Sequence, residues 1–198
     1  MFQSVRRLAL GTAVLLAGVA VPAAFAQAST WAIDPAHSGV EFSIKHLGVS
    51  TVRGSFSGVT GTVVWDEKNV GASHVDTVID AKTVNTGQEK RDEHLKSPDF
   101  FDVNQYPTIT FKSTSVKRDG EGKLQIVGDL KLGGQTKPVT LEVDGPATPQ
   151  KGMGGKLVSG FSATGTIKRS DFNFGQKYGA PMLGDEVRFT IDLEVSKQ

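Results

Sequence analysis

The chain has 198 residues, a formal net charge of +1, 38% hydrophobic residues and 22% charged residues. This balance is typical of a globular domain and argues against a disordered chain. The near-zero net charge provides no electrostatic attraction to nucleic acid or to an anionic membrane surface. Because the chain contains no cysteine, disulfides, thiol catalysis and thiolate metal sites are excluded.

Residues 1–26 have the pattern of a secretory signal peptide. Two arginines precede an uncharged apolar run (8–21), and the sequence AFA then places small residues at both cleavage positions. The run is short for a transmembrane helix, which disfavours an uncleaved anchor. We therefore expect a periplasmic protein of residues 27–198 that begins at Gln27, with cleavage after Ala28 as the near alternative.

Alternating apolar and polar residues recur along the rest of the chain, as in strands whose successive side chains point to opposite faces. The segments with this pattern are VEFSIKH (40–46), HVDTVIDAK (74–82), PTITFKS (107–113), KLQIVGDLKL (123–132), VTLEV (139–143), KLVSGFSATGTIK (156–168) and EVRFTIDLEV (186–195). GSFSGVTGTVVWD (54–66) is also strand-like, but its glycines predict a bend that changes which face is apolar. About eight strands with one apolar face each indicate an antiparallel barrel or sandwich.

The segment 86–107 interrupts the strands. Thr86 and Glu89 fit a capping box, which predicts a short helix over about 87–96. Ser97-Pro98 then ends the helix or begins a second short turn. The apolar anchors of the segment are Leu95, Phe100 and Phe101. So polar a helix is not a core element, and we expect it to cover one end of the barrel.

The segment 169–184 is a long loop with five large apolar residues, more than a purely solvated loop carries. It could line an opening of the barrel, dock on the helix or form a dimer contact. Simple packing beneath the loop is an equally good interpretation.

Motifs for catalysis or metal binding are absent from the sequence. There is no H-E-x-x-H and no G-x-S-x-G, and no helix-forming segment follows the glycines of GMGGK (152–156). The four histidines, His37, His46, His74 and His94, show no metal-ligand spacing. RDEH (91–94) could be an acid/base cluster, but a solvated helix face with i,i+3 and i,i+4 pairs is the better interpretation. We expect no enzyme, no metal and no cofactor.

The predicted inner face mixes large apolar residues with small ones, namely Gly128, Ser159, Ala163 and Gly165. An eight-stranded barrel is wide enough either to be filled by side chains or to hold one slender ligand. Small residues among large ones favour a cavity, because a filled interior needs bulk at most positions. A long apolar chain is the natural occupant, since few polar groups would orient a polar ligand.

Four segments then carry a resemblance to a known family: 31–61, beginning WAIDPAHSGVEF; SPDFFDVNQYPTITFKS (97–113); GDLKLGGQTKPVTLEV (128–143); and IKRSDFNFG (167–175). They resemble the YceI family of exported bacterial proteins, also called polyisoprenoid-binding or lipid-binding proteins, over essentially all of 31–195. The resemblance implies a single, extended, lipocalin-like antiparallel β-barrel with a short helical segment near one end. It also implies a long isoprenoid or similar amphiphile as ligand, no cofactor, no shared catalytic motif, and often a dimer.

The predicted function is therefore that of a periplasmic lipid carrier. The residues expected to touch the apolar tail are Phe42, Ile44, Ile79, Phe111, Leu141, Phe161 and Phe189. His46, Arg53 and Arg169 are the candidates to meet the head group, of quinone or polyprenyl phosphate type. His46 has the inward parity of its strand and stands at the strand's end, so it either bonds a turn carbonyl or contacts the head group. A homodimer and a transient contact with the inner membrane stay open. The alternatives are an enzyme that acts on such a lipid through His46 or His94, and a filled barrel that acts in stress or interaction through its surface.

Overall fold

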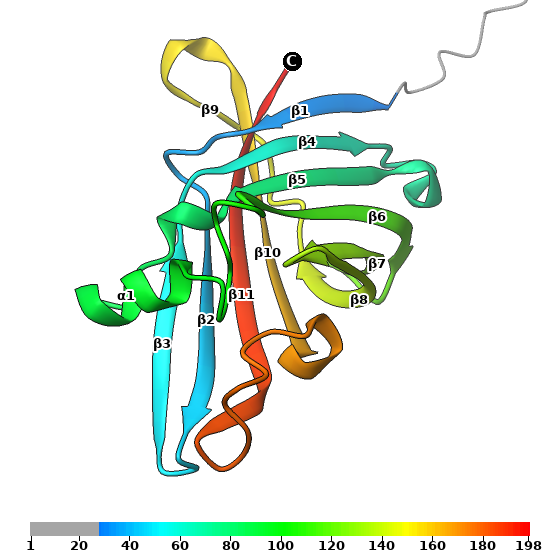
Figure 1. The fold of residues 1–198 in the computed structure, drawn as a ribbon. Helices are drawn as coiled ribbons and strands as arrows, with labels where there is room; N and C mark the ends of the chain where they lie inside the picture. The colour runs from blue at the N-terminus through cyan, green and yellow to red at the C-terminus, as the bar shows by residue number, and fades with distance from the viewer. Residues whose placement is uncertain (1–27) are drawn as a thin grey trace, which may run out of the picture.

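A computed structural model describes residues 28–198 (Figure 1). The predicted signal peptide and its cleavage site lie outside the described residues. Across residues 28–198, no helix combines the length and apolarity needed to cross a membrane.

The described chain forms one antiparallel sheet that closes on itself. Its strands are β1 (Ser29–Ile33), β2 (Gly39–His46), β3 (Ser50–Phe56), β4 (Val59–Trp65), β5 (His74–Asp80), β6 (Thr108–Arg118), β7 (Lys123–Leu132), β8 (Gln135–Asp144), β9 (Gln150–Lys151), β10 (Leu157–Lys168) and β11 (Leu183–Lys197). The helices are α1 (Glu89–Lys96) and the short 3₁₀ turns η1 (Val70–Ala72), η2 (Ala81–Thr83), η3 (Met153–Gly155) and η4 (Arg169–Phe172).

The barrel has eight strands because two of them are bent. β1 and β2 both pair with β11, along successive stretches of it, so together they form one strand interrupted by a loop. β3 pairs with β2 while β4 pairs with β1, so these two also form one bent strand. β9 is a two-residue addition beside β10. The predicted fold, a single antiparallel barrel of about eight strands with one short helix, is confirmed.

The bend between β3 and β4 lies at Ser57-Gly58, where Gly58 has φ +70°. Glycine adopts this left-handed conformation without steric cost. Phe56 and Val59 are both buried although they are three positions apart, so the apolar face changes parity here as predicted. The bend lets one strand belong to two differently oriented halves of the barrel.

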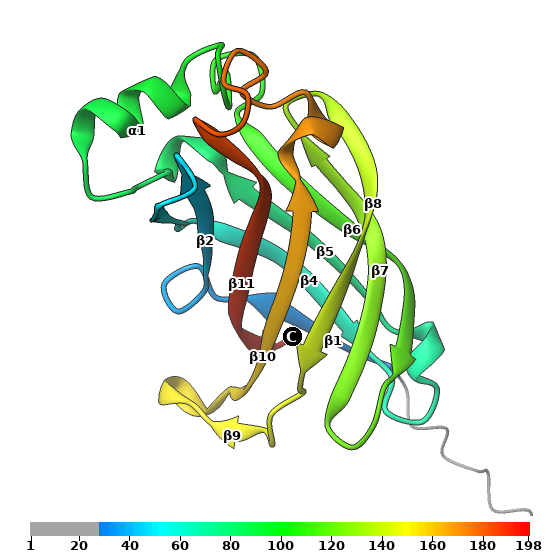
Figure 2. The same cartoon turned by 90° about the horizontal axis from the view of Figure 1, so that it is seen from below.

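The two halves of the barrel differ in closure. In the half formed by β1, β4, β5 and the end of β11, inward side chains such as Val59, Val63 and Val195 are buried in a continuous core. In the other half, β2 and β3 diverge from β5. Within residues 28–198, the outer edge of β3 pairs with no further strand, and its one bridge joins Ser55 to Asn85 in the segment before α1. α1 and the 169–183 segment lie at this splayed end, while β9 lies at the opposite end (Figure 2).

The predicted capping box is wrong. α1 begins at Glu89, and its N-cap is Gln88, whose side chain accepts a hydrogen bond from the Arg91 amide at 2.6 Å. The amide and hydroxyl of Thr86 donate instead to Asp92 Oδ1. The chain turns at Gly87, between Thr86 and the helix, which moves the helix start to Glu89. The C-terminus is as predicted, since Ser97 caps α1 and its hydroxyl donates to the His94 carbonyl.

Candidate ligand-binding site

A cavity of about 440 Å³ occupies the splayed half of the barrel. β2, β3, β5, β6, β7, β8, β10 and β11 all contribute inward side chains to it, and α1 and the 169–183 segment border it. The apolar lining residues are Val40, Phe42, Ile44, Val52, Phe56, Ile79, Leu95, Phe100, Phe101, Ile109, Phe111, Leu130, Leu132, Val139, Leu141, Ile167, Phe174, Met182, Leu183, Val187, Phe189 and Ile191. Its size lies within the range of small-molecule sites, and its wall is suited to an apolar chain.

Several wall residues are inward-facing but only half-buried. Ile44, Val187 and Phe189 belong to this group, although their parity matches that of fully buried residues elsewhere in the barrel. They stay accessible because they face the cavity rather than another layer of side chains. Covering their apolar surface with a ligand would stabilise the complex by about 25 cal/mol per Å² of area removed from water.

Apart from Thr77 on β5, the polar groups of the cavity gather at its mouth, which lies between α1, the 169–183 segment and the end of β2. His46 ends β2 and is exposed, and no hydrogen bond of its ring occurs among the described residues. Arg91 of α1 is half-buried, and its guanidinium donates to the hydroxyl and carbonyl oxygens of Thr86 at 2.7 and 2.9 Å. These groups give the cavity one polar end.

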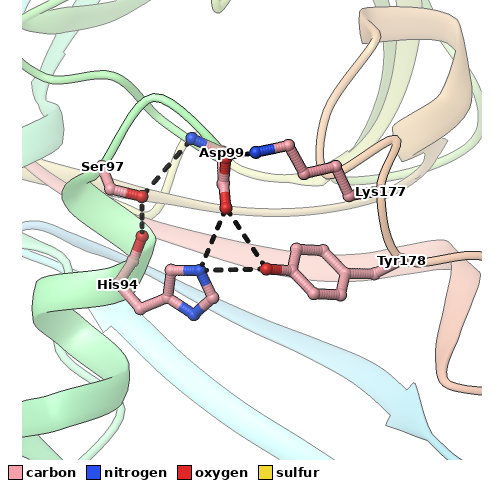
Figure 3. A network of polar contacts seen from close by, with 5 residues as sticks. All are labelled: His94, Ser97, Asp99, Lys177 and Tyr178. Atoms are coloured by element: carbon pink, nitrogen blue, oxygen red, sulfur yellow. Dashed lines mark hydrogen bonds and ion pairs between the residues drawn. The ribbon is translucent and has the colours of Figure 1, made fainter.

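Four side chains form a network across the mouth (Figure 3), here called the mouth network: His94, Asp99, Lys177 and Tyr178. His94 Nε2 lies 3.2 Å from the Tyr178 hydroxyl oxygen and 3.4 Å from Asp99 Oδ2. The Tyr178 hydroxyl donates to Asp99 Oδ2 at 3.2 Å, and the Lys177 ammonium pairs with Asp99 Oδ1. The Tyr178 ring also stacks on Phe100, with centroids 5.2 Å apart. The network thereby joins the helical segment to the loop before β11.

The contacts within the mouth network shift the pKa values of Asp99 and Tyr178. The hydrogen bond from Lys177 holds the pKa of Asp99 below its usual value, and His94 and Tyr178 act in the same direction. Desolvation raises the pKa of Tyr178, and the negative charge of Asp99 adds to this shift. At neutral pH the network therefore holds an ionised carboxylate and a neutral phenol, and the phenol can donate a hydrogen bond.

Arg169 holds the loop that frames the other side of the mouth. The residue is only 7% exposed, and its guanidinium donates five hydrogen bonds of 2.5 to 3.2 Å to backbone carbonyls. The accepting residues are Phe174, Gly175, Tyr178, Leu183 and Gly184. Since guanidinium has five N–H groups, all of its donors are used. Arg169 therefore borders the cavity but acts as a positioning residue for the loop.

Most of the site residues predicted from the sequence come together at the cavity. Those that line it are Phe42, Ile44, His46, Ile79, Phe111, Leu141, Arg169 and Phe189. Phe161 lies deeper in the barrel, beside a second and smaller cavity. Arg53 lies elsewhere, because its neighbour Val52 points inward and strand alternation turns Arg53 to the outer face.

The sequence-based interpretation missed the inward face of α1. The solvated-face interpretation of RDEH is correct for Glu93, which is exposed and pairs with Lys96. Arg91 and His94, however, border the cavity together with Leu95. Leu95 is the only apolar residue of the helix; Arg91 lies four residues before it, and His94 lies three residues after Arg91, so both relations place the residues on neighbouring parts of one helix face. This single leucine was the signal that could have placed Arg91 at the site, and His94 follows from its i,i+3 relation to Arg91.

A second cluster of titratable groups joins the loop between β1 and β2 to β11. The candidate ligand atoms of Asp34, His37 and Glu194 lie within 4.8 Å of one another. His37 Nδ1 is 2.9 Å from Asp34 Oδ2, and Asp34 Oδ1 accepts from the Ala36 amide. This hydrogen bond with Asp34 is the main cause of a raised His37 pKa. The arrangement is that of an exposed ion pair within an Asx turn, and it explains the loop conformation without a metal.

The fold and the cavity together define a class of protein, the closed antiparallel β-barrel with an apolar ligand cavity open at one end. A family model described as "YceI-like domain" matches residues 31–195. The chain therefore belongs to the YceI-like domain family.

Curated relatives and solved structures agree with this assignment. The chain is 44% identical over 162 residues to "Protein YceI" of Shigella flexneri, covering 82% of this chain and 83% of the relative. It is 35% identical over 190 residues to a UPF0312 protein of Vibrio vulnificus, covering 95% of each chain. Among solved structures, Burkholderia cenocepacia BcnA matches with a TM-score of 0.71 and 25% identity over 82% of this chain and 98% of BcnA. A Campylobacter jejuni YceI protein matches with a TM-score of 0.69 and 32% identity over 78% and 90% of the respective chains.

A more distant structure has the same fold. A polyisoprenoid binding domain from Saccharophagus degradans matches with a TM-score of 0.63 and 15% identity, covering 87% of this chain and all of that domain. At this identity the likeness concerns the fold alone.

Proposed function

We propose that this protein binds a long-chain isoprenoid, or a similar amphiphile, with the tail in the barrel and the head group at the mouth. The observation that carries the proposal is the polarity of the cavity: a wall on the barrel strands that is apolar apart from Thr77, and the charged and aromatic polar groups Arg91, His94 and Tyr178 at the mouth. Membership of the YceI-like domain family and the polyisoprenoid binding domain of the same fold support it. Each buried methylene contributes about 0.8 kcal/mol before losses, so tail burial dominates the affinity.

The head group meets donors from three separate elements. Arg91 and His94 come from α1, Tyr178 from the loop before β11, and His46 from the end of β2. A carbonyl, quinone or phosphate oxygen suits these donors, since neutral and charged donors both hydrogen-bond such an acceptor. Arg169 and Arg53 are not part of the proposed head-group site, because the first is saturated by carbonyls and the second faces outward.

We further propose that the protein acts in the periplasm as a carrier. The signal-peptide pattern of residues 1–26 supports export, and a barrel that shields an apolar tail from water suits transfer of a lipid through an aqueous compartment. Intact mass of protein recovered from the periplasmic fraction tests the export step. Export predicts a chain that begins at Gln27, whereas a chain that retains the first 26 residues contradicts it.

Organic extraction of the purified protein, followed by mass spectrometry, tests the binding function. The expected result is a near-stoichiometric amphiphile with a long apolar chain. Ile44→Glu places a carboxylate on the apolar wall, where an unpaired charge is costly, and should lose most of the bound lipid. Ser43→Glu is the matched control, because Ser43 is the next residue on β2 and pairs with Arg53 and Arg188. Equal lipid content in the two folded variants, or none in the parent protein, contradicts the proposal.

The same experiment separates binding from catalysis. Among the described mouth residues, His94 with Asp99 and Tyr178 is the grouping that could move a proton. A carrier returns the loaded lipid unchanged in mass. An altered lipid whose formation is lost in His94→Ala would instead establish an enzyme.

A further inference from the structure

The main cavity does not reach the end of the barrel. A second cavity of about 60 Å³ lies deeper, in the half closed by β4, β5 and β6. The two cavities share four lining residues, here called the partition: Thr77, Phe111, Leu141 and Ile191. A set of side chains that faces both spaces is the wall between them.

The deeper cavity has the chemistry of a site for the end of an apolar chain. Its lining is apolar apart from Ser73, His74 and Thr77. Trp65 and Phe161 form part of its wall, with ring centroids 6.3 Å apart. The Ser73 hydroxyl already accepts a hydrogen bond from the Asp66 amide, and the charged and phenolic donors Arg91 and Tyr178 border the main cavity instead, so the head group belongs at the mouth and the chain terminus at the partition.

Phe111 is held in place within the partition. Its ring lies against Gly128 of β7, where an added Cβ would come within 2.4 Å of the ring Cζ. The residue is only 7% exposed. Leu141, 5% exposed, contributes to the same wall from β8. Glycine at position 128 thus leaves room for the Phe111 ring beside the barrel wall.

We propose that Phe111 and Leu141 determine the length of chain that the protein accepts, by closing the main cavity before the deeper one. The proposal rests on the proposed function, since it presumes a tail in the cavity. Removing either side chain joins the two spaces into one longer site. The ligand preference then moves to longer chains, while the head-group contacts at the mouth are unaffected.

The experiment uses native mass spectrometry of the whole mature protein with an equimolar mixture of all-trans prenols, from farnesol upwards. Phe111→Ala is expected to favour prenols longer by at least one isoprene unit, with the ratio of long to short complexes rising by about tenfold or more. Ile109→Ala is the matched control, because Ile109 is on the same strand and face but lines the main cavity alone. It should weaken binding of all lengths alike.

Two further variants keep the test decisive if Phe111→Ala does not fold. Leu141→Ala opens the partition from β8, two strands away from Phe111 in the sheet, and should give the same shift. Ala163 lines the deeper cavity alone, so adding Ala163→Leu to an opened variant should restore the shorter preference. An unchanged length profile in a folded, prenol-binding partition variant overturns the chain-length proposal and leaves the binding function standing. Failure of the parent protein to bind any prenol counts against both.

Discussion

Replacing Arg169 by lysine tests whether the hydrogen bonds of this buried guanidinium hold the loop at the cavity mouth in place. Lysine keeps the positive charge but has three N–H donors against the five of arginine. At least two of the five carbonyl hydrogen bonds must therefore be lost. A hydrogen bond to a charged group contributes about 1.5–3 kcal/mol, which gives about 3–6 kcal/mol for two. Water can reach some of the released carbonyls, so we expect a loss of about 3 kcal/mol in the free energy of unfolding.

Urea denaturation followed by circular dichroism measures this loss. Arg188→Lys is the matched control, because Arg188 is exposed and its guanidinium hydrogen-bonds only to Glu186 among the described residues. The control should change stability by less than about 0.5 kcal/mol. We also expect faster exchange of the backbone amides in the 173–183 loop of Arg169→Lys. A change of under about 1 kcal/mol with normal amide protection would refute the reasoning.

Three other predictions concern the mouth and the wall. The depressed pKa of Asp99 means that the mouth network contributes stability above about pH 3.8 and loses it as the pH falls through the lower, folded-state pKa. Lipid release should therefore accelerate only in that acidic range, and Asp99→Asn should remove the acceleration; a release rate that already changes near neutral pH would contradict this. The His46→Leu variant should stay folded and bind the same apolar tails, but it should change the preference among lipids that have equal chain lengths and different head groups. For a head group with a neutral hydrogen-bond acceptor, the change in binding free energy should be about 0.5–1.5 kcal/mol. An unaltered preference would leave His46 without a ligand role. Gly165→Ala should push the Phe189 ring into the cavity, because the new Cβ would lie 2.4 Å from its Cζ, and so lower lipid capacity; full capacity in this variant would show that the ring has another way to move.

The strands and their inward faces follow from local sequence. Alternation predicts which side chains of β6, β7, β8 and β11 face inward, because a strand has a period of two whatever its neighbours are. The change of parity near Gly58 was also predictable, since glycine permits a backbone conformation that other residues rarely adopt. The apolar character of the cavity wall is the direct consequence of these two patterns.

The polar mouth depends on tertiary structure. His94 and Tyr178 are 84 positions apart in sequence, and their contact exists only because the splayed barrel brings α1 and the loop before β11 to one end. The five carbonyls around Arg169 are likewise set by a loop conformation that no residue pattern encodes. Arginine, histidine and tyrosine are equally at home on a solvated surface, so their residue types alone predict no convergence.

For this protein the sequence by itself determined the barrel, its apolar interior and its resemblance to the YceI family, because each rests on short-range alternation or on matching segments. Only the tertiary structure decided where the barrel opens, which cations lie at the opening and that Phe111 lines both cavities. Those features depend on the bend of two strands and on contacts between residues distant in the chain. The hydrogen bonds and packing that set them join residues that only the folded barrel brings together.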